Sequence, residues 1–237
     1  MARVFVYANS KGGSGKTTAA LVAATELALQ TKVGVVDADA RSRIARWAAK
    51  STVRPENLSV YGGSGEDNEV NETNILDKID QAASAAPIVI VDLEGAATTV
   101  SLLAISQADL VVIPLQDSEM DAFEAGAVIK VIRQQERLTK RSIPFCILPT
   151  RTPSAYRSKG MAFILGQLGP TGARILKAEL KERQAFKGMF MYFSPLEALP
   201  RGEVAGVDAA IENAREYVRE LLQVLKESSA KNEESVA

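Results

Sequence analysis

The segment Asn9–Thr18, with the sequence NSKGGSGKTT, decides the fold of this chain. It follows Val4–Ala8, a short β-branched and aromatic run, and precedes Ala19–Leu29, which is rich in alanine and leucine and holds no glycine or proline. The order is therefore strand, glycine-rich turn and helix, which is the context that a phosphate-binding loop requires. Glycines let successive N–H groups point inward around an anion, and the N-terminus of the following helix adds a partial positive charge.

Two side chains of this segment are placed for phosphate chemistry. Lys16 is expected to reach the β- and γ-phosphates of a nucleotide, and the Thr17 hydroxyl is expected to bind Mg²⁺. The general phosphate-loop pattern has glycine where this chain has Ser10, and a second lysine, Lys11, lies inside the loop. The alternative is a glycine-rich turn with lysines placed by chance, but the flanking strand and helix argue against it.

The run from Lys11 to Thr17, KGGSGKT, resembles the deviant phosphate loop of the ParA/MinD family of ATPases. The resemblance implies a Mg²⁺-dependent ATPase that hydrolyses ATP to ADP and phosphate. It implies catalytic roles for Lys16 and for Lys11, which would reach across a dimer interface to the partner's nucleotide. It also implies nucleotide contacts from the whole loop: Lys11, Gly12, Gly13, Ser14, Gly15, Lys16, Thr17 and Thr18.

Three aspartates come at or just after the ends of apolar runs. Asp37 and Asp39 close the run that starts at Lys32, and Asp92 ends the run 88–92. In open α/β sheets, ligands bind beyond the carboxyl ends of the strands, so these carboxylates are expected at the same edge as the phosphate loop. A carboxylate there can hold Mg²⁺, usually through a water molecule, or can simply cap the next turn.

The family resemblance assigns roles to these acids. Asp92 resembles the Walker B aspartate, Asp39 would position or activate the attacking water, and Asp37 would support the Mg²⁺ shell with Thr17 and Asp92. Thr150 stands where the family tends to carry an adenine-contacting asparagine. The chain departs from the family at Ala40-Arg41 and at Leu93-Glu94, which places an extra acid near the phosphates.

Strand-like and helix-like segments alternate along the whole chain. This order predicts an α/β fold, a doubly wound and mostly parallel sheet with helices on both faces. We expect a single domain over residues 1–227 and a polar, disordered tail over 228–237. Periodicity leaves the segment 175–180 open between strand and helix. Trp47 and Cys146 are expected to be buried packing residues.

Composition excludes several classes of protein. The 237 residues include one cysteine and no histidine, which excludes histidine-based catalysis, a disulfide framework and a cysteine-rich metal site. No run approaches the roughly 18 apolar residues of a membrane span, and strand-like sequence begins almost at Met1. We therefore expect a cytoplasmic protein.

Charge is unevenly distributed along the chain. Residues 1–129 hold 10 basic and 17 acidic groups, residues 130–202 hold 14 and 4, and residues 203–237 hold 4 and 8. The basic block is a candidate DNA surface, or a solvated face balanced by the acidic half. The candidate DNA-binding residues in it are Arg151, Arg157, Lys159, Lys177, Lys181, Arg183 and Lys187, with Arg174 beside them.

These features favour a ParA-like ATPase that dimerises on ATP binding, binds DNA non-specifically and drives plasmid partitioning or DNA positioning. The resemblance implies a small DNA-binding adaptor that stimulates hydrolysis, and association with the nucleoid in the ATP-bound state. The polar C-terminus lacks the pattern of a membrane-binding helix. One alternative is a nucleotide-switched scaffold for a protein cargo or a DNA-transfer complex, with little direct DNA binding. The other is a metabolic phosphate-loop enzyme.

Overall fold

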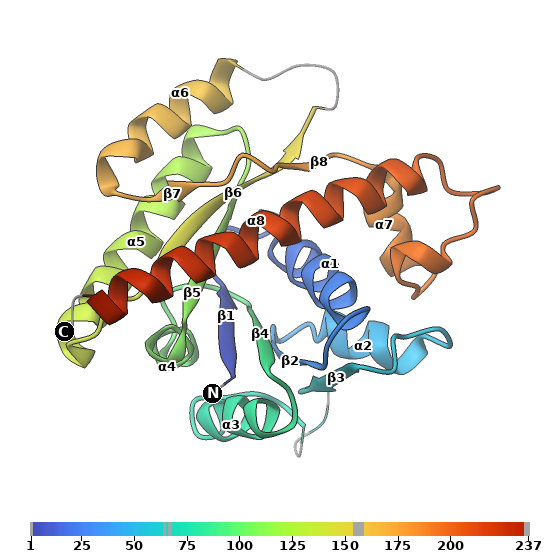
Figure 1. Ribbon diagram of the computed structural model, residues 1–237, viewed down its shortest axis with the longest axis horizontal. Helices are drawn as coiled ribbons and strands as arrows, with labels where there is room; N and C mark the ends of the chain where they lie inside the picture. The colour runs from blue at the N-terminus through green and yellow to red at the C-terminus, as the bar shows by residue number, and fades with distance from the viewer. Residues whose placement is uncertain (1, 64, 66–67, 154–158, 235–237) are drawn as a thin grey trace.

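The computed structural model describes residues 2–63, 65, 68–153 and 159–234 of the chain, shown in Figure 1. Its sheet has eight strands in the order β3-β2-β4-β1-β5-β6-β7, with β8 paired to β6 off this path, and each strand pair is parallel. The strands are β1 (Arg3–Tyr7), β2 (Val33–Ala38), β3 (Leu58–Tyr61), β4 (Ile88–Leu93), β5 (Leu110–Leu115), β6 (Phe145–Thr152), β7 (Arg174–Ile175) and β8 (Leu180–Lys181).

Helices cover both faces of this sheet. They are α1 (Lys16–Ala28), α2 (Arg43–Lys50), α3 (Ile75–Ala85), α4 (Thr99–Gln107), α5 (Glu119–Thr139), α6 (Lys159–Leu168), α7 (Gln184–Met191) and α8 (Val207–Glu234), with 3₁₀ turns at Gly169–Thr171 and Leu196–Ala198. The expected doubly wound, mostly parallel α/β fold is confirmed.

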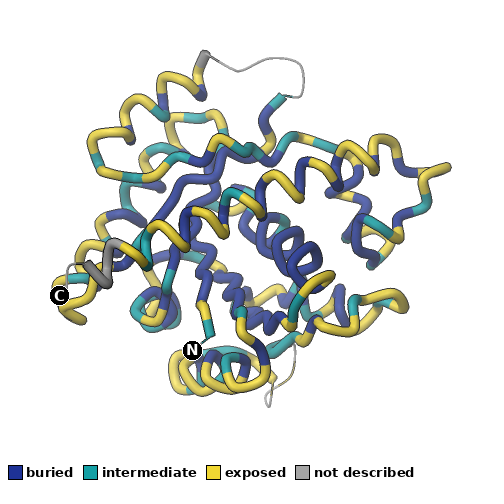
Figure 2. Tube along the Cα trace, viewed as in Figure 1, coloured by how far each residue is buried: buried dark blue, intermediate teal, exposed yellow. Residues whose placement is uncertain are grey.

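Strand β1 shows how the two faces are divided. Phe5 and Tyr7 pack into a core formed with α1, α2, α7 and α8, whereas Val4 and Val6 pack into a second core with α3, α4, α5 and α6. Side chains alternate across a strand with a period of two, so a continuously apolar strand fills both cores. Figure 2 shows the resulting buried sheet and the almost wholly buried helix α1, whereas the outer helices are exposed on one side.

Several local expectations are confirmed and others are corrected. Trp47 and Cys146 are fully buried. The open segment 175–180 runs from the end of strand β7 to the start of strand β8, with a bend between them. Helix α8 continues to Glu234, so the described part of the tail, 228–234, is helical in the structure, where no glycine or proline interrupts it. Helix α7 was not predicted.

Strand register brings the functional loops to one edge. Tyr7, which ends β1, pairs with Asp92 on β4, and Asp37 on β2 pairs with the same residue from the other side. The end of β5 pairs with β6 through Leu115 and Pro149. The phosphate loop, the two acidic segments and the turn after β5 therefore meet at the carboxyl edge of the central strands.

Candidate functional site

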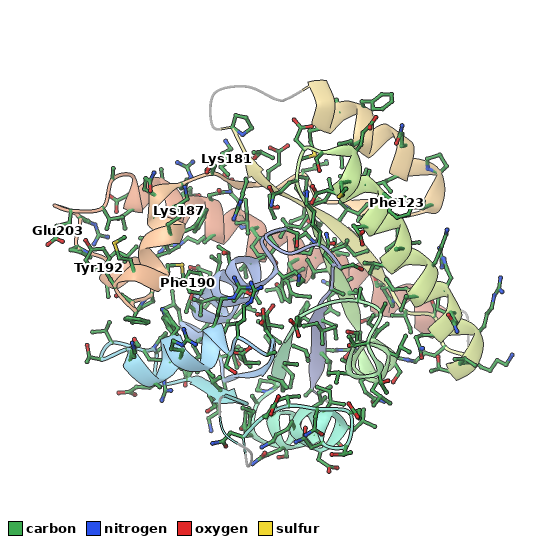
Figure 3. The ribbon with its side chains drawn as sticks, turned by 180° about the vertical axis from the view of Figure 1, so that it is seen from behind. Phe123, Lys181, Lys187, Phe190, Tyr192 and Glu203 are labelled. Atoms are coloured by element: carbon green, nitrogen blue, oxygen red, sulfur yellow. The ribbon has the colours of Figure 1, made fainter. Side chains whose placement is uncertain are left out.

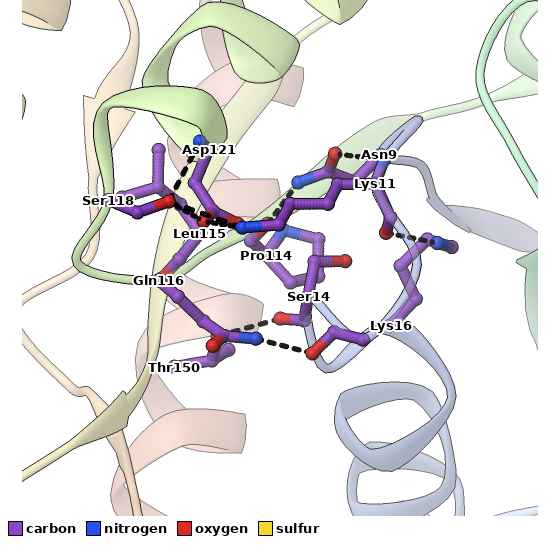
Figure 4. Close-up of polar contacts among 11 residues, drawn as sticks. Asn9, Lys11, Ser14, Lys16, Pro114, Leu115, Gln116, Ser118, Asp121 and Thr150 are labelled. Carbon is purple, nitrogen blue, oxygen red and sulfur yellow. Dashed lines mark hydrogen bonds and ion pairs between the residues drawn. The ribbon is translucent and has the colours of Figure 1, made fainter.

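The phosphate loop is held by hydrogen bonds to its carbonyl groups, drawn in Figure 4. Lys16 Nζ donates to the Lys11 carbonyl at 3.3 Å, the Gln116 amide donates to the Gly13 carbonyl, and the Thr150 hydroxyl donates to the Ser14 carbonyl at 2.7 Å. With these carbonyls engaged, other N–H groups of the loop can face an anion. The first helical hydrogen bond runs from Ala19 N to Gly15 O at 2.8 Å, so the N–H groups before it remain available.

Glycine is required at two positions of this loop. Gly13 and Gly15 have φ angles of +84° and +98°, in the region that L side chains rarely adopt. A Cβ atom at Gly15 would also lie 3.3 Å from Thr150 Cβ. Asn9 fastens the start of the loop, since its side chain donates to the Pro114 carbonyl at 2.6 Å and accepts from the Lys11 N–H at 3.0 Å.

Lys16 is a buried cation at the centre of the loop. It is 5% exposed. Burial lowers its pKa, and the nearby carboxylates of Asp92 and Asp39 act in the opposite direction. A desolvated ammonium group is a strong ligand for phosphate, and phosphate binding by Lys16 stays a prediction.

Thr17 and Asp92 are buried polar residues of the site. The Thr17 hydroxyl, the Ser14 hydroxyl and both Asp92 oxygens are buried, and they find no hydrogen-bond partner among the described residues. Burial raises the pKa of Asp92 to about 8, the neighbouring Asp37 adds to the rise, and the nearby Thr17 hydroxyl acts in the opposite direction. An orphaned carboxylate beside an orphaned hydroxyl is what a bound Mg²⁺ would satisfy, so these residues fit the metal that the loop implies.

Asp37 occupies the expected strand end but is already engaged. Its Oδ2 accepts from the Ala45 N–H at 2.8 Å and its Oδ1 accepts from the Asp39 N–H at 3.3 Å. Burial raises its pKa, and these two N–H groups partly offset that effect. Asp37 thus shapes the turn that carries Asp39, and its part in the Mg²⁺ shell stays a prediction.

Asp39 lies 4% exposed beside the loop. Its Oδ1 accepts from the Arg41 N–H at 2.9 Å, and its Oδ2 accepts from Arg43 Nη2 at 3.0 Å. Burial acts to raise the pKa of Asp39, but the Arg41 N–H and the Arg43 guanidinium outweigh it, so the pKa lies below its ordinary value. The carboxylate is therefore charged at neutral pH and its orientation is fixed.

Lys11 is bound within its own chain. Its Nζ lies 2.6 Å from Asp121 Oδ2 and 3.2 Å from Ser118 Oγ, at the start of α5 (Figure 4). The Asp121 side chain is fully buried, whereas that of Lys11 is 32% exposed. In the single chain the second lysine thus points to α5, and its contact with a partner's nucleotide stays a prediction.

A cavity of about 280 Å³ opens beside the loop. Thr150 lies in its wall with Gly15 and Thr18, and the apolar side chains Phe186 and Phe190 of α7 lie opposite. Such a cavity suits the base of a nucleotide whose phosphates occupy the loop. Thr150 is 3% exposed and donates to Ser14, so it also supports the loop. Neither phenylalanine was predicted as a site residue, because α7 was not predicted.

The predicted DNA-binding residues separate into two places. Arg151, Lys181, Arg183 and Lys187 line the cavity beside the phosphate loop, and Figure 3 shows Lys181, Lys187 and Phe190 together. Lys177 lines a different groove, of about 360 Å³, which we call the α8 groove. Arg157 lies outside the described residues, as does the side chain of Lys159. The α8 groove is formed by Arg174, Lys177, Ala178, Glu216, Arg219, Glu220 and Gln223.

Among the described residues, no three histidine, cysteine, aspartate or glutamate side chains gather as a metal cluster. None of the described helices combines the length and the apolar character that crossing a bilayer demands.

Sequence comparisons identify relatives over most of the chain. A family model described as ATPase MipZ matches residues 3–144. The protein ParA of Rhizobium radiobacter is 34% identical over 226 residues, which cover 95% of this chain and 98% of that protein.

Solved structures share the fold at low identity. An ATP complex of a Cyanothece McdA variant superposes with a TM-score of 0.73 at 17% identity, covering 94% of this chain and 96% of that one. The septum site-determining protein MinD of Pyrococcus horikoshii, complexed with Mg-ADP, has a TM-score of 0.68 at 16% identity, covering 92% and 96%.

Proposed function

Because the chain belongs to the family of MipZ- and ParA-type ATPases, we propose that it is a Mg²⁺-dependent ATPase that dimerises with ATP, binds DNA non-specifically and partitions or positions DNA. One observation carries the nucleotide site: a phosphate loop whose carbonyls are hydrogen-bonded to side chains lies beside the buried hydroxyl of Thr17 and the buried carboxylate of Asp92. An adaptor that stimulates hydrolysis is part of the proposal, by analogy with partition systems.

Each residue of the site has its own role in the proposed phosphoryl transfer. The loop N–H groups and Lys16 hold the phosphates, while Thr17 and Asp92 would hold Mg²⁺, which neutralises phosphate charge when bound. Asp39 orients a water molecule in line with the γ-phosphate. Phosphoryl transfer depends chiefly on such positioning and charge neutralisation, so this site needs no covalent nucleophile.

The start of α5 supports a dimer. Met120 and Phe123 are 63% and 75% exposed there, next to the half-buried Lys11–Asp121 ion pair; Figure 3 labels Phe123. Large apolar side chains exposed together mark a surface that another chain covers. A second copy docked on this face would lie within reach of Lys11.

Lys11→Ala is expected to reduce ATP-dependent dimer formation by on the order of tenfold or more, while ATP binding to the monomer changes by less than about threefold. Size-exclusion chromatography with a non-hydrolysable ATP analogue measures the dimer, and a fluorescent ATP analogue measures binding. Lys32→Ala, at an exposed lysine outside the site, is the matched control. Equal losses of dimer and of binding would contradict the role assigned to Lys11.

The α8 groove is the best-supported DNA contact in the described part of the chain. Arg174, Lys177 and Arg219 are exposed along it. One of its two acids, Glu220, accepts from the N–H groups of Lys177 and Ala178, at 3.0 and 2.7 Å, and the other is Glu216. Arg174 forms an ion pair with Glu227 at 3.8 Å, so Lys177 and Arg219 are the cations that we propose for phosphate contact. Such binding does not depend on the DNA sequence and weakens steeply with salt.

A gel mobility shift with ATP, with ADP and without nucleotide tests the proposal. We expect binding to duplexes of unrelated sequence with ATP alone, weaker at higher salt. Lys177→Ala should weaken the shift about threefold to tenfold and reduce the salt slope by about one. Lys181→Ala, at the cavity, should change the affinity for ATP more than it changes the affinity for DNA. Absence of a shift at low salt in every nucleotide state would remove DNA from the proposal.

One observation favours a second function. Four of the seven predicted DNA-binding residues line the cavity beside the loop, where a nucleotide would cover them. A nucleotide-switched scaffold for a protein cargo or a DNA-transfer complex, with little direct DNA contact, is the function that remains if the mobility shift is negative while ATP-dependent dimers form.

A further inference from the structure

Arg43 is a side chain of the nucleotide site that neither the loop pattern nor the acidic motifs explain. It is the first residue of α2, and its guanidinium turns back four residues along the chain to Asp39, with Nη2 3.0 Å from Oδ2. Its charge also acts on Lys16, so the guanidinium lies beside the phosphate loop. Arg43 therefore touches the carboxylate to which the proposed function gives the attacking water.

The turn that presents Arg43 is strained. Ser42 has a φ angle of +46°, a left-handed conformation that is unfavourable for a residue other than glycine. Its N–H donates to the Asp39 carbonyl at 2.7 Å. This tight turn closes the loop so that the side chain of Arg43 folds over the side chain of Asp39.

The ion pair with Asp39 also leaves the Arg43 guanidinium in an unfavourable environment. Arg43 Nε is buried and has no hydrogen-bond partner among the described residues. A partly exposed ion pair contributes little to stability, and an unpaired buried donor subtracts from it. Stability of α2 is therefore a poor explanation for this arrangement, whereas fixing the direction of one carboxylate is a good one.

We propose that Arg43 is a positioning residue for ATP hydrolysis, which holds Asp39 Oδ2 so that the carboxylate presents one fixed direction to the attacking water. The inference rests on the proposed ATPase function. With Oδ1 fixed by the Arg41 N–H at 2.9 Å, the guanidinium completes a two-sided clamp. Arg43 acts through Asp39 and does not itself bind the phosphates.

The first test separates turnover from binding. Arg43→Gln should lower kcat by roughly tenfold to a hundredfold, because a loosened carboxylate loses its orientation. The Kd for a fluorescent ATP analogue should stay within about threefold. Arg43→Lys should recover part of kcat. Arg46→Gln is the matched control, since Arg46 lies exposed on the same helix and contacts the Arg41 carbonyl instead of Asp39.

The second test is a double-mutant cycle with a readout besides turnover. Arg43→Gln added to Asp39→Asn should lower kcat by less than about twofold beyond Asp39→Asn alone, because both changes remove one function. By size-exclusion chromatography, Arg43→Gln should accumulate the same ATP-bound dimer as Asp39→Asn. Circular dichroism confirms that both variants fold.

Three outcomes overturn the inference. Unchanged kcat in Arg43→Gln, losses that multiply in the double variant, or a Kd that weakens in parallel with kcat would each show that Arg43 does not act through Asp39. These outcomes differ from a failure of the proposed function, which appears as absent ATP turnover by the unaltered protein with duplex DNA present, and which removes the inference with it.

Discussion

Lys16→Ala is expected to abolish nucleotide binding, with Kd weakened by on the order of a hundredfold or more, or about 3 kcal/mol. Lys16 is 5% exposed, and its ammonium group lies inside the loop at 3.3 Å from the Lys11 carbonyl. A phosphate that enters this loop gains a charge-assisted contact in a desolvated place, where such contacts are strong. No other described lysine is buried, so none can replace it.

A thermal shift measures this loss without relying on turnover. Mg-ATP at about 100 times its Kd should stabilise the unaltered protein by about 2.7 kcal/mol, or several degrees in Tm for a chain of this size. Lys16→Ala should show no shift with Mg-ATP, and Lys32→Ala should show the full one. A variant that kept a Kd within threefold of the original would contradict the role of Lys16 in phosphate binding.

The features predicted best from sequence were those that depend on neighbours in the chain. The phosphate loop is local, because Gly13 and Gly15 provide the left-handed turns and the helix follows at once. Asp39 and Asp92 were placed at one edge by a general rule, since the carboxyl ends of parallel strands meet there. The register of β2, β4 and β1 then brings Asp37, Asp92 and Tyr7 into line.

Contacts between distant segments could not be predicted in this way. Lys11 and Asp121 are 110 residues apart, and nothing in either local pattern indicates that they pair. Charge along the chain says nothing about the direction of a side chain. Because β8 joins β6 with Leu180 opposite Thr150, Lys181 faces the cavity, while Lys177, only four positions earlier, lies in the α8 groove.

Short helices were also difficult to predict from the sequence. Helix α7 has eight residues, and so short an apolar segment does not distinguish helix from strand by its periodicity. Its Phe186 and Phe190 nevertheless form the wall of the cavity opposite the phosphate loop. Because the helix was not predicted, the nearby basic residues were assigned to DNA, although they lie where a nucleotide base would fit.

Asp92→Asn is expected to make the ligand-free protein more stable at pH 8 and to remove its stabilisation by Mg²⁺. Asp92 is fully buried and its pKa in the fold is about 8, against about 3.9 for an unfolded aspartate. The unfolded chain loses this proton at lower pH than the fold does. The free energy of unfolding therefore falls as pH rises between these two values and is level outside them, at a cost on the order of a few kcal/mol.

Asparagine keeps the shape of the side chain and cannot ionise, so Asp92→Asn should escape this loss. Urea unfolding with EDTA measures the free energy of unfolding, and Asp92→Asn should exceed the unaltered protein by more at pH 8 than at pH 5. For Asp80→Asn, at an exposed site on α3, the difference from the unaltered protein should not change with pH. With Mg-ATP the unaltered protein should be the more stable of the two, because only the carboxylate can hold the cation with Thr17. A stability difference independent of pH would show that burial of Asp92 does not carry this cost, and an undiminished Mg²⁺ effect would show that the metal is held elsewhere.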